Sequence, residues 1–333
     1  MDSADQVVFE FMPFIKAYKS GRIERLFGTD FVPPTLNSEN GVSSKDVVID
    51  PQTGVSARVF IPTNKIKPGQ NLPVLVYFHG GAFCLCSPFC AMYHSYLTTL
   101  VEKVNVIAVS VDYRLAPEHP LPAAYEDSWN ALKYVASHSA GNGPESWLND
   151  HADFERVFLA GDSAGANISH NITLRAGIDG LMGMNINGVC IIHPDFVGRE
   201  GSLNIAWNFI CPDTCGESDT RVNPAIDPRL GNMGCSKMLV CVAEKDEFRD
   251  AGWIYYEAVK NSEWKGHVEI TETTGEDHIF HLFNPANEKA AIFLDKVVSF
   301  ISTGAQLKGL SSEVPASDVR KRERSSPEFK ISV

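Results

Sequence analysis

The hydrophobic residues of this chain gather in short continuous runs, separated by stretches with a helical spacing. Four such runs lie at residues 74–78, 106–111, 189–192 and 238–242. A continuous apolar run of this length is typical of a strand that is covered on both faces. Helical spacing predicts helices between them at about residues 88–103, 121–138, 164–176 and 252–261. Strands that alternate with helices indicate an α/β fold with a mainly parallel sheet and right-handed crossovers.

The two ends of the chain follow other patterns. Residues 55–61 alternate apolar and polar positions after a turn signal at 51–54, which favours antiparallel strands at one end of the sheet. Residues 5–18 carry a rough helical stripe, so a helix is predicted in this leader. A strand near residues 268–270 and a helix at about residues 288–301 complete the pattern.

Two segments interrupt this organisation. Residues 198–228 are longer than an ordinary connection and mix aromatic residues with Cys, Pro, Asp and Asn, which is typical of a lid or binding loop. Residues 305–333 are polar, rich in Ser and without an apolar period, so a disordered tail is predicted there. We therefore expect one domain over residues 1–304, followed by the tail.

Composition and charge remove several classes of function. The chain has 44% hydrophobic and 21% charged residues, which is typical of a globular protein. It has no uninterrupted apolar stretch of the roughly 18 residues that a membrane-spanning helix needs, so no membrane association is expected. The formal net charge of −12 would repel a phosphate backbone, so we expect no nucleic-acid partner.

The N-terminus and the cysteines bear on the compartment. The first five residues, MDSAD, are acidic and lack the basic start and apolar core of a secretory signal, which predicts a cytoplasmic protein. The eight cysteines are then expected to be reduced and to serve as small buried hydrophobic residues. Cys211 and Cys215 have no second ligand pair nearby, so a zinc site is not expected.

The pentapeptide GDSAG at residues 161–165 is the motif from which the search for catalytic residues starts. It has the form G-x-S-x-G of a nucleophile elbow, in which a serine occupies a tight turn between a strand and a helix. The glycines are needed because such a turn leaves no room for side chains two residues to either side of Ser163. The turn would also place Ser163 at a helix N-terminus, which favours developing negative charge.

A serine nucleophile needs a base, and the base needs an acid that orients it. Asp246 is the candidate acid, because it follows the apolar run at residues 238–242 by a short loop. His278 is the candidate base, because it lies in the loop before the last predicted helix, with His281 as its competitor. The residues that compete with Asp246 are Glu244, Glu247 and Asp250, each of which could instead be a solvated charge or a helix cap.

The same chemistry needs hydrogen-bond donors for an oxyanion. The sequence HGGAF at residues 79–83 directly follows the apolar run at 74–78, and its glycines allow backbone N–H groups to face a tetrahedral intermediate. The expected donors are the N–H groups of Gly80, Gly81 and Ala164. The order of serine, acid and histidine along the chain is the order that α/β hydrolases use.

These motifs together resemble a known family. The sequences HGGAF at 79–83, DYRLAPEH at 112–119 and GDSAG at 161–165, with the places of Asp246 and His278, resemble the hormone-sensitive-lipase-like group of α/β hydrolases. About residues 9–302 are similar to plant carboxylesterases related to the gibberellin receptors. The resemblance implies an α/β-hydrolase fold: an eight-stranded, mainly parallel sheet, helices on both faces, and a small helical cap from about residues 1–40 and 198–228.

The resemblance also implies roles for individual residues. Ser163, Asp246 and His278 would form a catalytic triad, and residues 112–119 would support the oxyanion loop. Gibberellin receptors of this group lack the histidine, related dehydratases carry threonine at the nucleophile position, and certain alkaloid cyclases have lost the histidine. This chain keeps both Ser163 and His278, which favours hydrolysis.

Two positions depart from the pattern of the family. Ala166 stands where a third glycine is usual after the elbow, and the expected effect is slightly tighter packing between helix and strand. Asp195 stands where an aromatic residue is common. It could favour a cationic or hydroxyl-bearing substrate, or it could be hydrogen-bonded structure.

The sequence thus predicts a serine carboxylesterase that acts on short-chain esters of a small molecule without a metal or organic cofactor. We expect a monomer or a weak homodimer. The alternatives are a lyase, dehydratase or cyclase of specialised metabolism that uses the same pocket, and a small-molecule receptor that does not react with its ligand.

Overall fold

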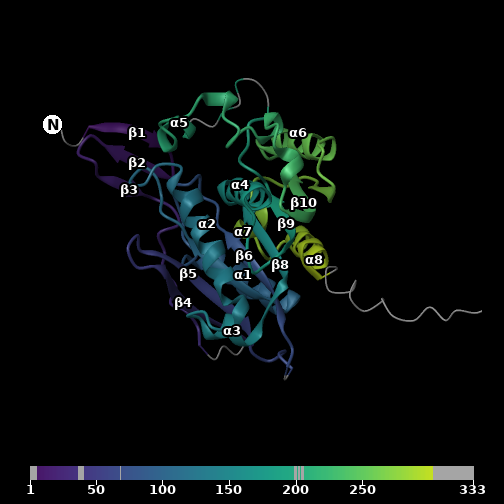
Figure 1. Cartoon of the computed structure of the whole chain (residues 1–333). Coiled ribbons are helices and arrows are strands. Elements are labelled where there is room, and N and C mark those ends of the chain that lie inside the picture. The colour runs from purple at the N-terminus through teal and green to yellow at the C-terminus, as the bar shows by residue number, and fades with distance from the viewer. Residues whose placement is uncertain are drawn as a thin grey trace, which may run out of the picture.

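A computed structural model describes residues 6–36, 41–67, 69–198, 201, 203 and 206–302. Its centre is an eight-stranded sheet with the order β11-β10-β9-β8-β6-β7-β5-β4 (Figure 1). The strands are β4 (Val42–Asp50), β5 (Val55–Pro62), β6 (Leu72–Phe78), β7 (Ile107–Asp112), β8 (Ala152–Asp162), β9 (Ile186–Ile192), β10 (Cys235–Ala243) and β11 (His267–Thr273).

The sheet is mainly parallel, as predicted. The six strands from β11 to β7 pair in parallel, and β5 pairs antiparallel with both β7 and β4. The continuous apolar runs at residues 74–78, 189–192 and 238–242 lie in buried parallel strands, and the run at 106–111 does so from Ile107 onward. The carboxyl ends of these strands meet along one edge, and that edge carries the candidate chemistry.

Helices pack around this sheet (Figure 1). They are α1 (Ala91–Val104), α2 (Ala123–Ala136), α3 (Ser146–His151), α4 (Ala164–Asp179), α5 (Trp207–Ile210), α6 (Arg249–Lys260), α7 (Phe280–Phe283) and α8 (Glu288–Ser302). Short 3₁₀ helices lie at Ser137–Ala140, Gly216–Ser218, Pro224–Ile226 and Leu230–Asn232. Helix α1 packs against α8, and α2 packs against α4. The longer helices agree with the sequence predictions, with shifted ends.

The helix predicted in the leader is wrong. This segment forms a separate three-stranded antiparallel sheet of β1 (Val7–Phe11), β2 (Ile15–Tyr18) and β3 (Ile23–Arg25). Two physical reasons override the helical spacing. The apolar residues are mostly β-branched or aromatic, which favours strands, and Pro13 stands in the middle of the expected helix, where it would remove a hydrogen bond.

The two segments predicted to form a helical cap are therefore only partly helical. The segment at residues 198–228 contributes α5 and short 3₁₀ turns, whereas the leader contributes strands. Phe9 of β1 stacks on Phe209 of α5, with 3.9 Å between the ring centroids, so the two segments are in contact. The tail predicted at residues 305–333 lies outside the described residues.

Two other sequence observations concern the described part of the chain. All eight cysteines lie in it, and seven are buried, as expected for small hydrophobic residues, while Cys215 is exposed. Among the described residues, no helix has both the length and the hydropathy that crossing a membrane requires.

The glycines of the elbow are needed because three backbone segments meet there. A Cβ atom on Gly165 would lie 2.0 Å from the carbonyl oxygen of Phe78, at the end of β6. A Cβ atom on Gly161 would lie 2.3 Å from the carbonyl oxygen of Gly165. These distances are far below a van der Waals contact, and the obstacles are backbone atoms that cannot turn away. Strand β8, helix α4 and the end of β6 therefore approach this closely only without side chains.

We expect Gly165→Ala to prevent folding, because its methyl group would overlap the Phe78 carbonyl. Gly54→Ala is the control, because Gly54 has open space around it. Its φ of +79°, which the helical Gly165 does not share, is unfavourable for alanine, so about 1–2 kcal/mol of destabilisation is expected. Soluble yield and the midpoint of thermal unfolding measure both. Similar midpoints for the two variants would contradict the steric explanation.

Candidate active site

Ser163 lies at the junction between β8 and α4 in a conformation that few non-glycine residues adopt. Its φ is 54° and its ψ is −120°. The surrounding backbone holds this geometry, since the Ser163 N–H group donates to the carbonyl of Ile192 at 2.9 Å. The residue is only 7% exposed, yet it lines a cavity. A strained, cavity-facing serine at a helix N-terminus is the geometry that the sequence predicts for a nucleophile.

Asp246 and His278 lie together, as the order of the motifs requires. His278 Nδ1 is 2.9 Å from Asp246 Oδ2, and the second carboxylate oxygen accepts the N–H of Phe248 at 2.9 Å. Because the carboxylate only accepts, this contact places a proton on Nδ1 of the imidazole. The other ring nitrogen, Nε2, is then left as an acceptor.

The loops that carry the acid and the base are joined by the extension of the sheet. Beyond the β10–β11 pairing, the Glu244 N–H donates to Thr273 at 3.1 Å and the Lys245 N–H donates to Glu276 at 2.9 Å. The Glu244 side chain accepts the Gly275 N–H at 2.6 Å. These bonds fix the separation of the two loops.

The competing residues lie in other surroundings. The Glu244 carboxylate accepts the N–H of Gly275 in the neighbouring loop, and the Asp250 carboxylate forms an ion pair with Arg249. Glu247 lines the cavity but is exposed. His281 lies in α7, where it is buried against the ring of Phe293 at 4.4 Å between centroids. Of the candidates, Asp246 and His278 are the pair that the structure joins by a hydrogen bond.

The pKa of His278 differs from those of the neighbouring histidines. Burial lowers its pKa, but the hydrogen bond and the charge of Asp246 outweigh burial, so its pKa is raised above the ordinary 6.5. Burial lowers the pKa of His193 well below 6.5, and lowers that of His281 to about 3. His278 is therefore the imidazole of this group that is suited to hold a proton.

The turn at residues 79–83, which is predicted to supply oxyanion donors and which we call the oxyanion turn, has one of its predicted donors already engaged. Gly81 and Ala82 line the cavity together with Ser163. The N–H of Gly80 instead donates to the Tyr93 hydroxyl at 2.7 Å. Ala82, which directly follows the two glycines, was not among the donors that the sequence predicts. Its φ of 51° continues the left-handed turn of Gly81, whose φ is 107°.

A buried carboxylate ties this turn to the elbow. Asp162, the residue before the serine, accepts the hydroxyls of Tyr77 and Tyr93, each at 2.7 Å. Because Tyr93 also accepts the Gly80 N–H, its hydroxyl links the oxyanion turn to β8. Burial raises the pKa of Asp162, opposed by the two hydroxyl hydrogen bonds. The sequence did not reveal this link, because the motif G-x-S-x-G allows any residue at the position of Asp162.

Residues 112–119 support the turn from the other side, as the resemblance implies. The Tyr113 hydroxyl donates to the carbonyl of His79 at 2.7 Å, and the two rings stack with centroids 4.3 Å apart. The Ala116 N–H donates to the carbonyl of Phe83 at 2.9 Å. The oxyanion turn is thus held at both of its ends.

The cavity above these groups has a volume of about 390 Å³. Its walls combine the candidate catalytic residues with rings from the leader and from late loops. The lining residues are Phe11, Phe14, Phe27, Gly81, Ala82, Leu85, Cys86, Met92, Tyr93, Ser163, Asp195, Glu247, Phe248, Asp277, His278, Ile279 and Phe283. This size lies within the usual range for small-molecule sites.

The two departures from the family pattern lie close to the serine. Asp195 lines the cavity, and its backbone N–H donates to the Ser163 carbonyl at 3.3 Å. Its own carbonyl accepts the Asn167 side chain at 3.1 Å. Ala166 is completely buried in the first turn of α4. The backbone of Asp195 thus contributes to the structure around Ser163. Its side chain, which lines the cavity, is still a candidate for substrate selection.

His193, Asp246 and His278 form the one cluster of possible metal ligands among the described residues. Their ligand atoms lie within 4.8 Å of one another. However, the Ile279 N–H already donates to His193 Nδ1 at 2.8 Å, and His278 Nδ1 shares its proton with Asp246. The hydrogen bonds of this cluster fit proton transfer better than coordination of a metal.

Comparisons with known proteins agree with this geometry. A family model described as alpha/beta hydrolase fold matches residues 75–282. Probable carboxylesterase 5 of Arabidopsis thaliana is 44% identical over 89% of this chain and 98% of that protein. A 2-hydroxyisoflavanone dehydratase of Glycyrrhiza echinata is 45% identical over 88% of this chain and 95% of that protein. The crystal structure of an esterase from Pyrobaculum calidifontis has a TM-score of 0.66 and 26% identity, over 82% of this chain and 87% of the other.

We expect Tyr93→Phe to destabilise the fold by about 3–4 kcal/mol, because both Asp162 Oδ2 and the Gly80 N–H lose the hydroxyl that pairs with them. Tyr77→Phe removes one hydrogen bond to the same carboxylate, so about 2 kcal/mol is expected. Denaturant unfolding of the two variants measures the difference. Equal losses would show that the bond to Gly80 contributes nothing.

Proposed function

Since this chain belongs to the family with the α/β-hydrolase fold and is a carboxylesterase-type hydrolase, we propose that it cleaves short-chain esters of a small molecule through a Ser163–His278–Asp246 triad. The observation that carries the proposal is the 2.9 Å contact between His278 and Asp246 at the cavity that Ser163 also lines. A specialised metabolite is the proposed source of the ester.

In the first step, the Ser163 hydroxyl attacks the carbonyl carbon of the ester, and its proton passes to Nε2 of His278. Nε2 is the acceptor because Nδ1 holds the proton shared with Asp246. The negative carboxylate stabilises the imidazolium that forms. When the tetrahedral intermediate collapses, His278 returns the proton to the leaving alkoxide, and an alcohol and an acyl-enzyme result.

The oxyanion of the intermediate needs backbone donors close to Ser163. We assign this role to the N–H groups of Gly81, Ala82 and Ala164. Gly81 and Ala82 border the cavity beside the serine, and Ala164 begins helix α4, whose dipole favours negative charge. The predicted contribution of Gly80 is less favoured, because its N–H is bound to Tyr93. Gly80 would act by fixing the turn instead.

Water then hydrolyses the acyl-enzyme. His278 takes a proton from the water, the hydroxide adds to the acyl carbonyl, and Ser163 leaves with the proton that His278 returns. The products are a carboxylic acid and the free enzyme, so no metal or organic cofactor enters the balance. The phenylalanine rings of the leader favour apolar or aromatic groups on the substrate.

A dehydratase is the second candidate, favoured by the relative of that name. It would use the same cavity to eliminate water instead of adding it. Against it stand Ser163 and His278, which supply the nucleophile and base that hydrolysis requires. A receptor is the third candidate, but it has no need for a strained serine in the cavity.

We expect Ser163→Ala to abolish the release of 4-nitrophenol from 4-nitrophenyl acetate, and to prevent covalent labelling by a fluorophosphonate. Ser169→Ala is the matched control on helix α4, since its hydroxyl donates to the carbonyl of Gly165 and does not line the cavity. It should keep both activities. The proposal would be contradicted if the wild-type protein neither hydrolysed 4-nitrophenyl acetate nor reacted with the fluorophosphonate. Turnover of a 2-hydroxyisoflavanone in place of the ester would favour the dehydratase.

The raised pKa of His278 predicts a pH dependence with a definite sign. The base works only when it is neutral, so kcat/KM should fall as the pH drops through a pKa above 6.5. Asp246→Asn removes the charge that raises this pKa, so the acid limb should move to lower pH while kcat falls by about a thousandfold or more.

Glu244→Gln is the control for this pH profile, because Glu244 lies in the same loop but its side chain accepts the Gly275 N–H. Its acid limb should coincide with that of the wild type. A limb that stays in place in Asp246→Asn would mean that another group titrates.

A further inference from the structure

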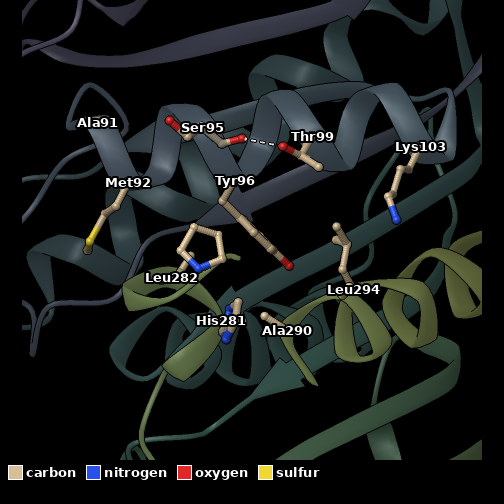
Figure 2. A pocket seen from close by; sticks show the side chains of 12 residues that line it. Ala91, Met92, Ser95, Tyr96, Thr99, Lys103, His281, Leu282, Ala290 and Leu294 are labelled. Atoms are coloured by element: carbon tan, nitrogen blue, oxygen red, sulfur yellow. Dashed lines mark hydrogen bonds between the residues drawn. The ribbon is translucent and has the colours of Figure 1, made fainter. Parts of the chain in front are cut away.

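A second cavity, separate from the candidate active site, lies between helix α1 and the α7–α8 segment (Figure 2). We call it the α1–α8 groove, and its volume is about 500 Å³. It is lined by Ala91, Met92, Ser95, Tyr96, Thr99, Lys103, His281, Leu282, Pro285, Ala290, Ala291 and Leu294. Met92 lines both cavities, so the groove is a neighbour of the candidate active site.

The groove contains polar atoms that the protein itself does not satisfy. Tyr96 Oη and both ring nitrogens of His281 are buried, and none of the three has a hydrogen-bond partner among the described residues. Tyr96 extends from α1 toward α8, and His281 lies below it in Figure 2. Their rings meet edge to face at 5.2 Å. Buried polar groups are nearly always paired, because each unpaired one costs stability.

The charge state of these groups selects the ligand. Burial, followed by the charge of His278, lowers the pKa of His281 to about 3, so its imidazole is neutral near pH 7. A neutral imidazole has one N–H donor and one acceptor nitrogen, and the Tyr96 hydroxyl can also donate or accept. Such a pair complements a hydroxyl group on a ligand. It offers no charge to an anion or a cation.

The remainder of the groove is suited to an apolar body. Most of its lining residues are aliphatic, and Met92, Leu282 and Leu294 have the largest side chains among these. Lys103 is the cation at its border, and its ammonium group already pairs with Asp295 at 2.8 Å. The Thr99 hydroxyl donates to the carbonyl of Ser95 within α1. These bonds leave the buried pair of Tyr96 and His281 as the main polar recognition element.

We propose that the α1–α8 groove is a second small-molecule site, which takes a neutral, mainly apolar molecule with one hydroxyl group, such as an aromatic alcohol. The apolar body lies between α1 and α8, and the hydroxyl binds Tyr96 and His281 after a small movement of the side chains that cover these buried atoms. The site does not depend on the function proposed for Ser163, because it uses none of the triad.

Benzyl alcohol and toluene are the probes, since they have the same carbon skeleton and differ only in one hydroxyl group. Ligand-detected NMR titration measures their affinities. Ala291→Phe fills the groove from the exposed side of α8, so binding of benzyl alcohol should weaken at least tenfold. Ile292→Phe, on the same helix but outside the groove, is the matched control and should bind as the wild type does. Equal binding by the two variants would overturn the location.

Tyr96→Phe and His281→Phe test the recognition of the hydroxyl. Each should reduce the ratio of benzyl alcohol affinity to toluene affinity by about fivefold to tenfold, the value of one hydrogen bond. Tyr96→Phe should keep or raise the midpoint of thermal unfolding, because it removes an unpaired buried hydroxyl, so loss of fold cannot imitate the result. An unchanged ratio in Tyr96→Phe would mean that ordered water satisfies these atoms, and would overturn the proposal.

Discussion

The close approach of three backbone segments at the elbow is the constraint on which the rest of the site depends. Helix α4 begins against the end of β6, at a distance that only glycine at 161 and 165 allows. This contact brings the turn after β6 to the serine at the end of β8. Tyr93 then fastens the two together, because its hydroxyl bonds both Asp162 and Gly80. Backbone geometry, more than side-chain recognition, thus assembles the groups around Ser163.

The sequence predicted those parts of the molecule in which local pattern and chemistry coincide. The buried strands appear as continuous apolar runs, and the triad candidates directly follow strands whose carboxyl ends share one edge. His278 could be named because its loop lies between the last strand and the last long helix. What placed it beside Asp246 is the parallel pairing of β10 with β11, which the order of the strands implies.

The wrong prediction of a leader helix, and the features that the sequence did not reveal, depend on long-range contacts or on an ambiguous spacing. In the leader, a helical stripe and an irregular strand pattern cannot be told apart by spacing, and the strand is selected by contacts such as Phe9 on Phe209. The engagement of Gly80 by Tyr93 joins residues thirteen positions apart. The left-handed φ of Ala82 is equally hidden, since alanine rarely adopts it. Each of these features is imposed by the assembled fold.

The three histidines near the cavity have the same side chain but different pKa values, because their surroundings differ. The ring of His193 contacts the rings of both His278 and His281, with centroid distances of 5.9 Å and 5.6 Å. Burial acts to lower the pKa of each imidazole, and in His193 and His281 it prevails. His278 alone among the three is hydrogen-bonded to a carboxylate, that of Asp246, which outweighs burial and raises its pKa. A proton on His278 also disfavours protonation of the other two, since like charges repel. The charge that ester hydrolysis would create is therefore confined to one ring, while His193 stays neutral and accepts the N–H of Ile279, the residue that follows the base.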